Sequence, residues 1–99
     1  MIDPDDTSKS VLELAEEITS NERIIQYGHP SKNFTDIARI WSVILGIEIT
    51  PQQVGLCNIA TKLCREINSQ KRDNLVDICG YAKAVDLVNC YQEYEDEEN

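Results

Sequence analysis

Apolar residues recur every three to four positions through four segments of the chain, a spacing typical of amphipathic helices. The first segment starts near Ser10, where Ser10 and Glu13 have the spacing of a capping box, and it ends at Gly28. Pro30 then indicates that the helix does not resume at once. The apolar positions of this first predicted helix are Val11, Leu14, Ala15, Ile18 and Ile25.

The second predicted helix runs from about Asn33 to Leu45. Asn33 can cap its start, Asp36 lies in its first turn, and Gly46 closes it. The apolar positions of this helix predict a buried stripe, made of Phe34, Ile37, Trp41, Ile44 and Leu45.

The third and fourth predicted helices carry apolar residues over more than half of their circumference. The third starts with Thr50, Pro51 and Gln53, which supply an N-cap, a proline at the first helical position and a capping glutamine. The fourth starts within residues 71–73 and ends near Gln92. So wide an apolar surface predicts that the third helix is central and contacted from two sides. The cysteines in these patterns are predicted to be free thiols in the core, namely Cys57, Cys64 and Cys79.

The pattern excludes a sheet and predicts an all-α fold. No segment alternates apolar and polar residues for long enough to form a strand pair, and residues 47–49 make only an extended connector. We expect a compact four-helix domain that spans residues 1–99 as one unit, with its core at about 8–92 and a solvated acidic tail at 93–99. Because two helices are apolar nearly all round, we expect a homodimer or larger homo-oligomer.

Net charge and apolar runs restrict the partners and the location. The net charge is −9, so the chain is a poor candidate for binding duplex DNA, which requires clustered lysine and arginine. No apolar run approaches the roughly 20 residues that span a bilayer, so we expect no membrane partner. The acidic N-terminus lacks the basic and apolar regions of a secretory signal, which predicts a cytoplasmic protein, in the host cytoplasm if it is viral.

A basic cluster lies at the turn between the third and fourth predicted helices. Four of the nine basic residues fall within eleven positions here: Lys62, Arg65, Lys71 and Arg72. A concentrated positive charge on an acidic chain is what a phosphate-bearing small ligand requires. The alternative is that Lys62 pairs with Glu66 one turn away, and that Arg72 pairs with an acid on a neighbouring helix.

Acidic residues and the single histidine are the other candidates for chemistry. Asp73 and Asp77 are one helical turn apart, with Tyr81 a turn further, and two such carboxylates can share a magnesium ion. Their alternative is a solvated face with support from the helix dipole. His29 precedes Pro30 and is interpreted first as a turn residue. The first helix adds a further group of acids that could help to hold magnesium, namely Glu13, Glu16 and Glu17. The alternative is that these acids form a solvated face and that Glu13 caps the helix.

Two blocks of residues carry a family resemblance. They read Tyr-Gly-x-Pro-x-x-Asn-Phe over residues 27–34 and Asp-x-x-x-Asp-x-x-Gly-Tyr over residues 73–81. Together they resemble a small, uncharacterised domain family encoded mainly by tailed bacteriophages, over about residues 22–88. More distantly, the chain is similar to the all-α nucleotide pyrophosphohydrolases of the MazG kind. Those enzymes use Glu-x-x-Glu and Glu-x-x-Asp on successive helices, and the acids here depart from that spacing.

The residues and the resemblance lead to three hypotheses. The first is a phage nucleotide-binding protein without catalysis that sequesters host immune signalling nucleotides, including cyclic nucleotides. The second is a magnesium-dependent nucleoside triphosphate pyrophosphohydrolase of the MazG-like kind, with Asp73 and Asp77 as metal ligands, so the sequence leaves open whether the protein is an enzyme. The third is an acidic adaptor that binds a host protein through residues 93–99. The predicted ligand-binding residues are Tyr27, His29, Lys62, Arg65, Arg72 and Tyr81.

Overall fold

A computed structural model describes the backbone of residues 3–98, and the side chains of that range except those of residues 23, 25, 27 and 92–98. The described chain is all helical and contains no strand, which confirms the predicted fold class. None of its helices is long and apolar enough to cross a bilayer. The helices are α1 (Val11–Ile18), α2 (Asn21–Tyr27), α3 (Pro30–Leu45), α4 (Pro51–Asn68) and α5 (Arg72–Glu98).

The segment predicted as one N-terminal helix is divided into α1 and α2. The predicted capping box is present, since the Glu13 amide donates to Ser10 Oγ at 3.0 Å and the Ser10 amide donates to the Glu13 carboxylate at 3.2 Å. The division falls at Thr19, whose hydroxyl donates to the Ala15 carbonyl at 2.7 Å. Threonine and serine side chains compete with the helical hydrogen-bond pattern, so a helix ends readily here.

Helix α3 begins three residues earlier than predicted, at Pro30. His29 is its N-cap, and His29 Nδ1 accepts a hydrogen bond from the Ser31 amide at 3.0 Å. Proline is well suited to the first helical position because the N–H that it lacks would have no helical partner there. Pro30 therefore starts a helix instead of delaying one. Gly46 closes α3 in the left-handed conformation, as predicted, with φ of 71°.

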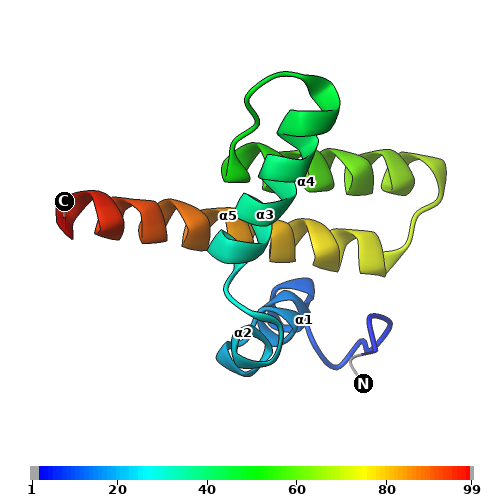
Figure 1. Cartoon of the computed structure of the whole chain (residues 1–99). Helices are drawn as coiled ribbons and strands as arrows, with labels where there is room; N and C mark the ends of the chain where they lie inside the picture. The colour runs from blue at the N-terminus through cyan, green and yellow to red at the C-terminus, as the bar shows by residue number, and fades with distance from the viewer. Residues whose placement is uncertain (1–2, 99) are drawn as a thin grey trace.

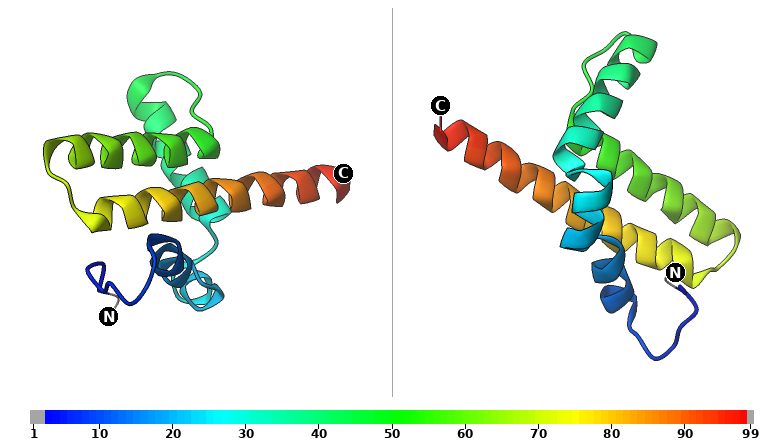
Figure 2. Two further views of the ribbon diagram at one scale, coloured as in Figure 1. Left: turned by 180° about the vertical axis from the view of Figure 1, so that it is seen from behind. Right: turned by 60° about the horizontal axis from the view of Figure 1, so that its bottom comes forward.

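Helices α4 and α5 lie side by side and antiparallel, and they form the body of the molecule (Figure 1). The predicted start of α4 is confirmed, because Thr50 and Gln53 cap each other and Pro51 follows. Helix α3 crosses both long helices, and α1 packs on the side of α5 that faces away from α4, as both views in Figure 2 show. Helix α5 continues beyond the predicted end near Gln92, to Glu98.

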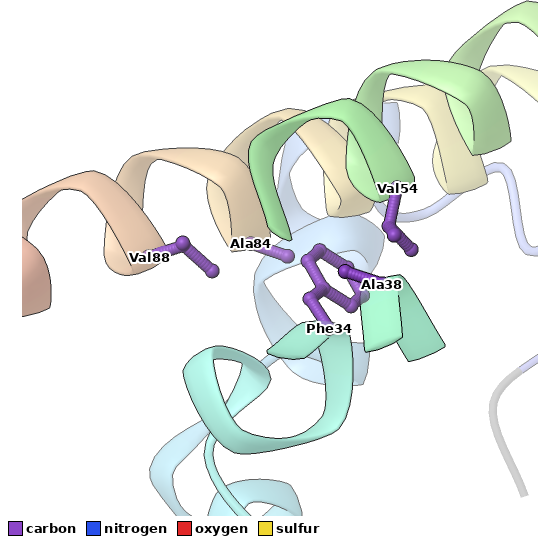
Figure 3. Close-up of a cluster of buried hydrophobic side chains, with 5 residues drawn as sticks. All are labelled: Phe34, Ala38, Val54, Ala84 and Val88. Carbon is purple, nitrogen blue, oxygen red and sulfur yellow. The ribbon is translucent and has the colours of Figure 1, made fainter. Parts of the chain in front are cut away.

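The core consists of two small clusters. In the larger one, the Phe34 ring points from α3 toward α4 and α5 (Figure 3), and its partners are Ala38, Val54, Ala84 and Val88. The smaller cluster joins α1 to α5 through Leu14, Ala15 and Val76. Close packing of α4 is possible at Gly55, where an added Cβ would meet Val85 Cγ2 at 2.4 Å.

Much of the predicted buried surface is exposed. Helix α4 does contact two helices, α3 and α5, but only Val54 and Gly55 of α4 are buried. The expectation of core thiols is wrong for Cys57 and Cys64, which are exposed, whereas Cys79 is half-buried. All four cysteines are free. Ile44 and Leu45, predicted to be buried, are also exposed. The reason is that the described chain provides no element to cover the outer face of α4 and the end of α3.

Candidate ligand-binding site

A basic pocket lies at the turn that joins α4 to α5. Its volume is about 430 Å³. It is lined by the end of α4, the turn and the first residues of α5, through Lys62, Arg65, Asn68, Ser69, Lys71, Asp73 and Asn74. The structure thus brings together three of the four residues of the predicted basic cluster. We call this hollow the basic pocket.

Hydrogen bonds to Glu66 hold the turn in place. The carboxylate oxygen Oε1 of Glu66 accepts from the Lys71 amide at 2.9 Å and from Asn74 Nδ2 at 3.2 Å. Asn74 is buried, and its Nδ2 also lies 3.4 Å from the Ser69 carbonyl. Glu66 therefore binds the turn and does not form the ion pair with Lys62 that was the alternative predicted from the sequence.

Lys62 pairs instead with Asp77 across the two long helices. Lys62 Nζ lies 2.9 Å from Asp77 Oδ2, and the two side chains are 16% and 24% exposed. Arg65 and Lys71 are exposed, and neither is within 4.0 Å of any carboxylate oxygen that the structure describes. The basic pocket therefore presents two solvent-accessible cations that have no described carboxylate oxygen within 4.0 Å, beside a third cation that is neutralised and one acid, Asp73.

A second pocket gathers the two sequence blocks that carry the family resemblance. Its volume is about 340 Å³, and it lies between α1, α3 and α5. From the first block it is lined by Pro30, Asn33 and Phe34, and from the second by Asp77, Gly80 and Tyr81. Ile18, Thr19 and Ala84 complete it. We call this hollow the motif pocket.

Asp77 lines the motif pocket and forms an ion pair with Lys62, which lines the basic pocket. The ion pair therefore links a residue that lines one hollow to a residue that lines the other. Tyr81 is half-buried, packs against the larger core cluster and lines the motif pocket one turn further along α5.

The predicted metal ligands do not share a pocket. Asp73 lines the basic pocket, whereas Asp77 lines the motif pocket and is paired with Lys62. The described residues contain no group of three or more His, Cys, Asp or Glu side chains that can hold a metal ion. The acids of α1 are engaged separately, Glu13 in its capping box, Glu16 with Lys83 at 2.7 Å and Glu17 with Lys9 at 2.5 Å.

Arg72, predicted to bind ligand, does not line the basic pocket and contacts backbone carbonyls of the N-terminal segment. Its Nη1 donates to the Asp6 carbonyl at 2.6 Å and lies 3.4 Å from the Pro4 carbonyl, while its Nη2 donates to the Lys9 carbonyl. The first turn of α5 faces the N-terminal segment, whose carbonyls provide acceptors for the guanidinium. The alternative, in which Arg72 pairs with an acid on a neighbouring helix, is not observed among the described side chains.

Two further residues were predicted to bind ligand, His29 and Tyr27. His29 lines neither the basic pocket nor the motif pocket. His29 caps α3, and its ring centroid lies 5.3 Å from that of Tyr91. It lines a separate hollow with residues of α3, among them Lys32 and Arg39. The side chain of Tyr27 is not among the described ones.

Sequence reasoning missed the amide and hydroxyl groups of the basic pocket. Asn68, Ser69 and Asn74 provide polar groups beside the cations. Their position at the end of one helix and the start of the next was a usable signal, because residues at helix ends approach one another across a short turn. Asn33 was predicted as a helix cap and Phe34 as a core residue, but neither was predicted to line a pocket.

Comparisons with known proteins identify relatives but no solved fold. Residues 10–89 match the family described as "Domain of unknown function (DUF6378)". The chain is 38% identical over 82 residues to the Gene 55 protein of Mycobacterium phage D29, an alignment that covers 82% of this chain and 54% of the relative. It is 37% identical over 81 residues to the Gene 55 protein of Mycobacterium phage L5, covering 80% of this chain and 52% of the relative.

The chain spans about half the length of the phage relatives that it matches. No solved structure matches it. The predicted resemblance to an uncharacterised phage-encoded family is confirmed, whereas the more distant MazG-like relationship stays a prediction.

Proposed function

This chain belongs to the DUF6378 family, and we propose that it binds a nucleotide, with the phosphates in the basic pocket and the base in the motif pocket. One observation carries the proposal. Arg65 and Lys71 face solvent at one pocket without a described counter-ion, in a chain whose net charge is −9. An acidic chain repels anions over most of its surface, so a local excess of cations marks where an anion is held.

The groups around the basic pocket suit a phosphate. The Arg65 guanidinium offers paired donors that match two phosphate oxygens, and the Lys71 ammonium adds a point charge. The side chains of Asn68 and Ser69 offer further donors at the same pocket. The first amides of α5 begin beside it, where the helix dipole favours negative charge.

The motif pocket suits a base. Tyr81 and Phe34 provide aromatic surface, and the side chain of Asn33 provides polar groups that can read base edges. A cavity of this size is of the order that small ligands occupy. The Lys62–Asp77 pair links the two hollows, and we propose that the sugar of a bound nucleotide lies over this pair.

We infer that binding, without turnover, is the activity. The acids that the pyrophosphohydrolase hypothesis requires do not meet at one place. Asp73 and Asp77 line different pockets. Asp77, Glu16 and Glu17 each form an ion pair with a different lysine. The phage origin of the relatives supports a role in which the protein sequesters a signalling nucleotide of the host. Residues 93–99, on which the adaptor hypothesis depends, lie outside the described side chains.

Calorimetry tests the proposal with a charge-matched control. The probes are a cyclic dinucleotide, ADP-ribose and dATP, each titrated into the full chain. The double variant Arg65→Ala/Lys71→Ala removes the two accessible cations of the basic pocket. The control Lys32→Ala/Arg39→Ala removes two exposed cations from α3, where both lie beside Asp36.

We expect at least one probe to bind, and the basic-pocket variant to lose tenfold or more of the affinity, while the control loses less than about twofold. The absence of heat with all three probes, or equal losses in both double variants, would contradict the proposal. The nucleotide is recovered afterwards and analysed in the presence of magnesium. Intact nucleotide supports binding alone, whereas pyrophosphate release that Asp77→Asn abolishes would support the hydrolase hypothesis.

A further inference from the structure

The outer face of α4 carries an apolar seam that the described chain leaves open. The seam consists of residues spaced alternately three and four apart, which is the spacing of a helix that packs along another helix. Its large members are between 50% and 85% exposed. The seam residues are Gln53, Leu56, Ala60, Leu63 and Ile67, flanked on one side by Cys57 and Cys64.

The seam lies on the side of α4 opposite to its buried contacts. Val54 and Gly55 face the core, and Lys62 faces Asp77 of α5. The side of α4 that is turned away from α5 is open along the C-terminal half of the helix in both Figure 1 and Figure 2. The period of the sequence and the exposure of the side chains therefore agree that the C-terminal half of this stripe, at Leu63 and Ile67, has no partner within the described chain.

We propose that this face is where two copies of the chain meet, with the two α4 helices packed antiparallel about Ala60. A stripe without a charged residue fits an apolar partner, and the same stripe on a second copy is such a partner. With Ala60 opposite Ala60 of the second copy, each Leu56 lies opposite Leu63 of the other. The small residue at the centre allows close approach, and the leucines pack on either side of it.

The seam exposes three large apolar side chains, those of Leu56, Leu63 and Ile67, so a homodimer of standard size also needs apolar surface from α3 and the link to α4. Helices α3 and α4 and the link between them expose eight large apolar side chains: Ile40, Val43, Ile44, Leu45, Ile47, Leu56, Leu63 and Ile67. At roughly 100 Å² per fully exposed aliphatic side chain, these expose on the order of 500 Å². A standard homodimer interface buries about 800 Å² per partner, of which about 65% is apolar, so it needs a similar area.

A neighbouring hollow supplies a place for a side chain of the second copy. It has a volume of about 370 Å³ and joins the seam to α3 through Trp41 and Leu45. Leu56 and Ala60 of the seam line the same hollow. In the antiparallel arrangement Leu63 of the second copy lies at Leu56, where it fills this hollow.

Charge selects the antiparallel direction over the parallel one. Residues 51–61 of α4 contain no charged side chain, whereas the end of the helix carries Lys62 and Arg65 beside the basic pocket. A parallel pair would place the two basic pockets at the same end, where they repel each other. An antiparallel pair places each basic end against the uncharged start of the other helix and also opposes the two helix dipoles.

Mass measurement on the full chain tests the interface, independently of nucleotide binding. Light scattering after size exclusion is expected to give twice the chain mass of 11.2 kDa. Leu63→Glu is expected to raise the dimer dissociation constant by about 100-fold or more, because it places a charge in the seam. Leu12→Glu, at an exposed leucine of α1, is the control and should remain dimeric. Far-ultraviolet circular dichroism verifies that both variants are folded.

Disulfide trapping tests the direction. Cys57 and Cys64 lie seven residues apart on one helix, about 10.5 Å, which exceeds the roughly 7 Å that a disulfide spans between Cα atoms. A Cys57–Cys64 disulfide therefore has to join two chains. In a Cys79→Ser/Cys90→Ser background, mild oxidation is expected to give a covalent dimer with that linkage. A monomeric chain, a Leu63→Glu variant that stays dimeric, or linkage of Cys57 to Cys57 would overturn the proposal.

Discussion

Replacing Asp77 by asparagine is expected to change the stability of the fold and the affinity for nucleotide in opposite directions. Asparagine keeps the shape of the side chain, and its amide oxygen can still accept from Lys62 Nζ, now 2.9 Å from the carboxylate. The change therefore removes the charge of Asp77 and little else. It leaves the Lys62 ammonium, which is only 16% exposed, without a counter-ion.

The cost in stability follows from the partial burial of the pair. Exposed ion pairs contribute about 0–1 kcal/mol, and removal of one partner from a fully buried pair costs about 3–5 kcal/mol. Side chains that are 16% and 24% exposed lie between these limits, so we expect Asp77→Asn to lower the free energy of unfolding by about 1–2 kcal/mol. For a chain of 99 residues this lowers Tm by about 4–15 °C.

The same substitution should strengthen phosphate binding. Lys62 lines the basic pocket, and without Asp77 its positive charge is available to a phosphate. We expect the affinity for a bound nucleotide to rise about three- to tenfold, which corresponds to roughly 0.7–1.4 kcal/mol. A variant that is less stable yet binds more tightly is the signature of this arrangement.

Urea unfolding and calorimetry on the same preparation measure both effects. Asp36→Asn is the control, because Asp36 forms a pair with Lys32 at the same 2.9 Å distance, but those side chains are 50% and 75% exposed. We expect that control to change stability by less than about 0.5 kcal/mol and to leave binding unaltered. The reasoning is refuted if Asp77→Asn is as stable as the wild type, or if it binds nucleotide more weakly.

Three further outcomes are expected. Arg72→Ala should lower the free energy of unfolding by about 1–3 kcal/mol and speed proteolysis within residues 3–10, because three backbone carbonyls lose a charged donor, while nucleotide affinity changes less than about twofold. Gly55→Ala should cost about 1–3 kcal/mol in urea unfolding, although alanine favours helices by about 1 kcal/mol, because the new Cβ would lie 2.4 Å from Val85 Cγ2 and 3.0 Å from the Phe34 ring. Nucleotide affinity should fall with rising salt in the wild type, and a salt-independent affinity would count against phosphate recognition.

The local signals in the sequence were reliable because they depend on neighbouring residues. The capping pairs at Ser10 and Thr50 and the left-handed Gly46 are all present as predicted. Each is decided by hydrogen bonds or steric limits within a few residues. The start of α3 at Pro30 follows the same local chemistry, but proline can either start or interrupt a helix, and the predicted interruption was wrong.

Burial was harder to predict because it depends on which elements pack together. The apolar pattern of α4 is the same whether its second face meets a helix of this chain or nothing in this chain. Cys57 and Cys64 were therefore predicted to be buried, whereas both are exposed. The break at Thr19 also went unpredicted, because the apolar period of the sequence continues across it.

The candidate site was predictable in part, for the same physical reason. Lys62, Arg65 and Lys71 flank one short turn, so proximity in sequence implied proximity in space, and they do line one pocket. The partners of Lys62 and Arg72 were not predictable, because they depend on how α5 is rotated about its axis against α4 and the N-terminal segment. The rotation of α5 about its axis also explains why Asp73 and Asp77, which share a helix face, line different pockets.

Nitrogen–proton correlation NMR of the full chain tests the central claim most directly, since every backbone amide of the turn reports on its own surroundings. Inorganic pyrophosphate and dATP are titrated separately. We predict that both shift the amides of residues 68–74 at the basic pocket, and that dATP alone also shifts those of residues 77–81 at the motif pocket. Shifts that are absent from residues 68–74, or that centre on α3 around Lys32 and Arg39, would contradict the account.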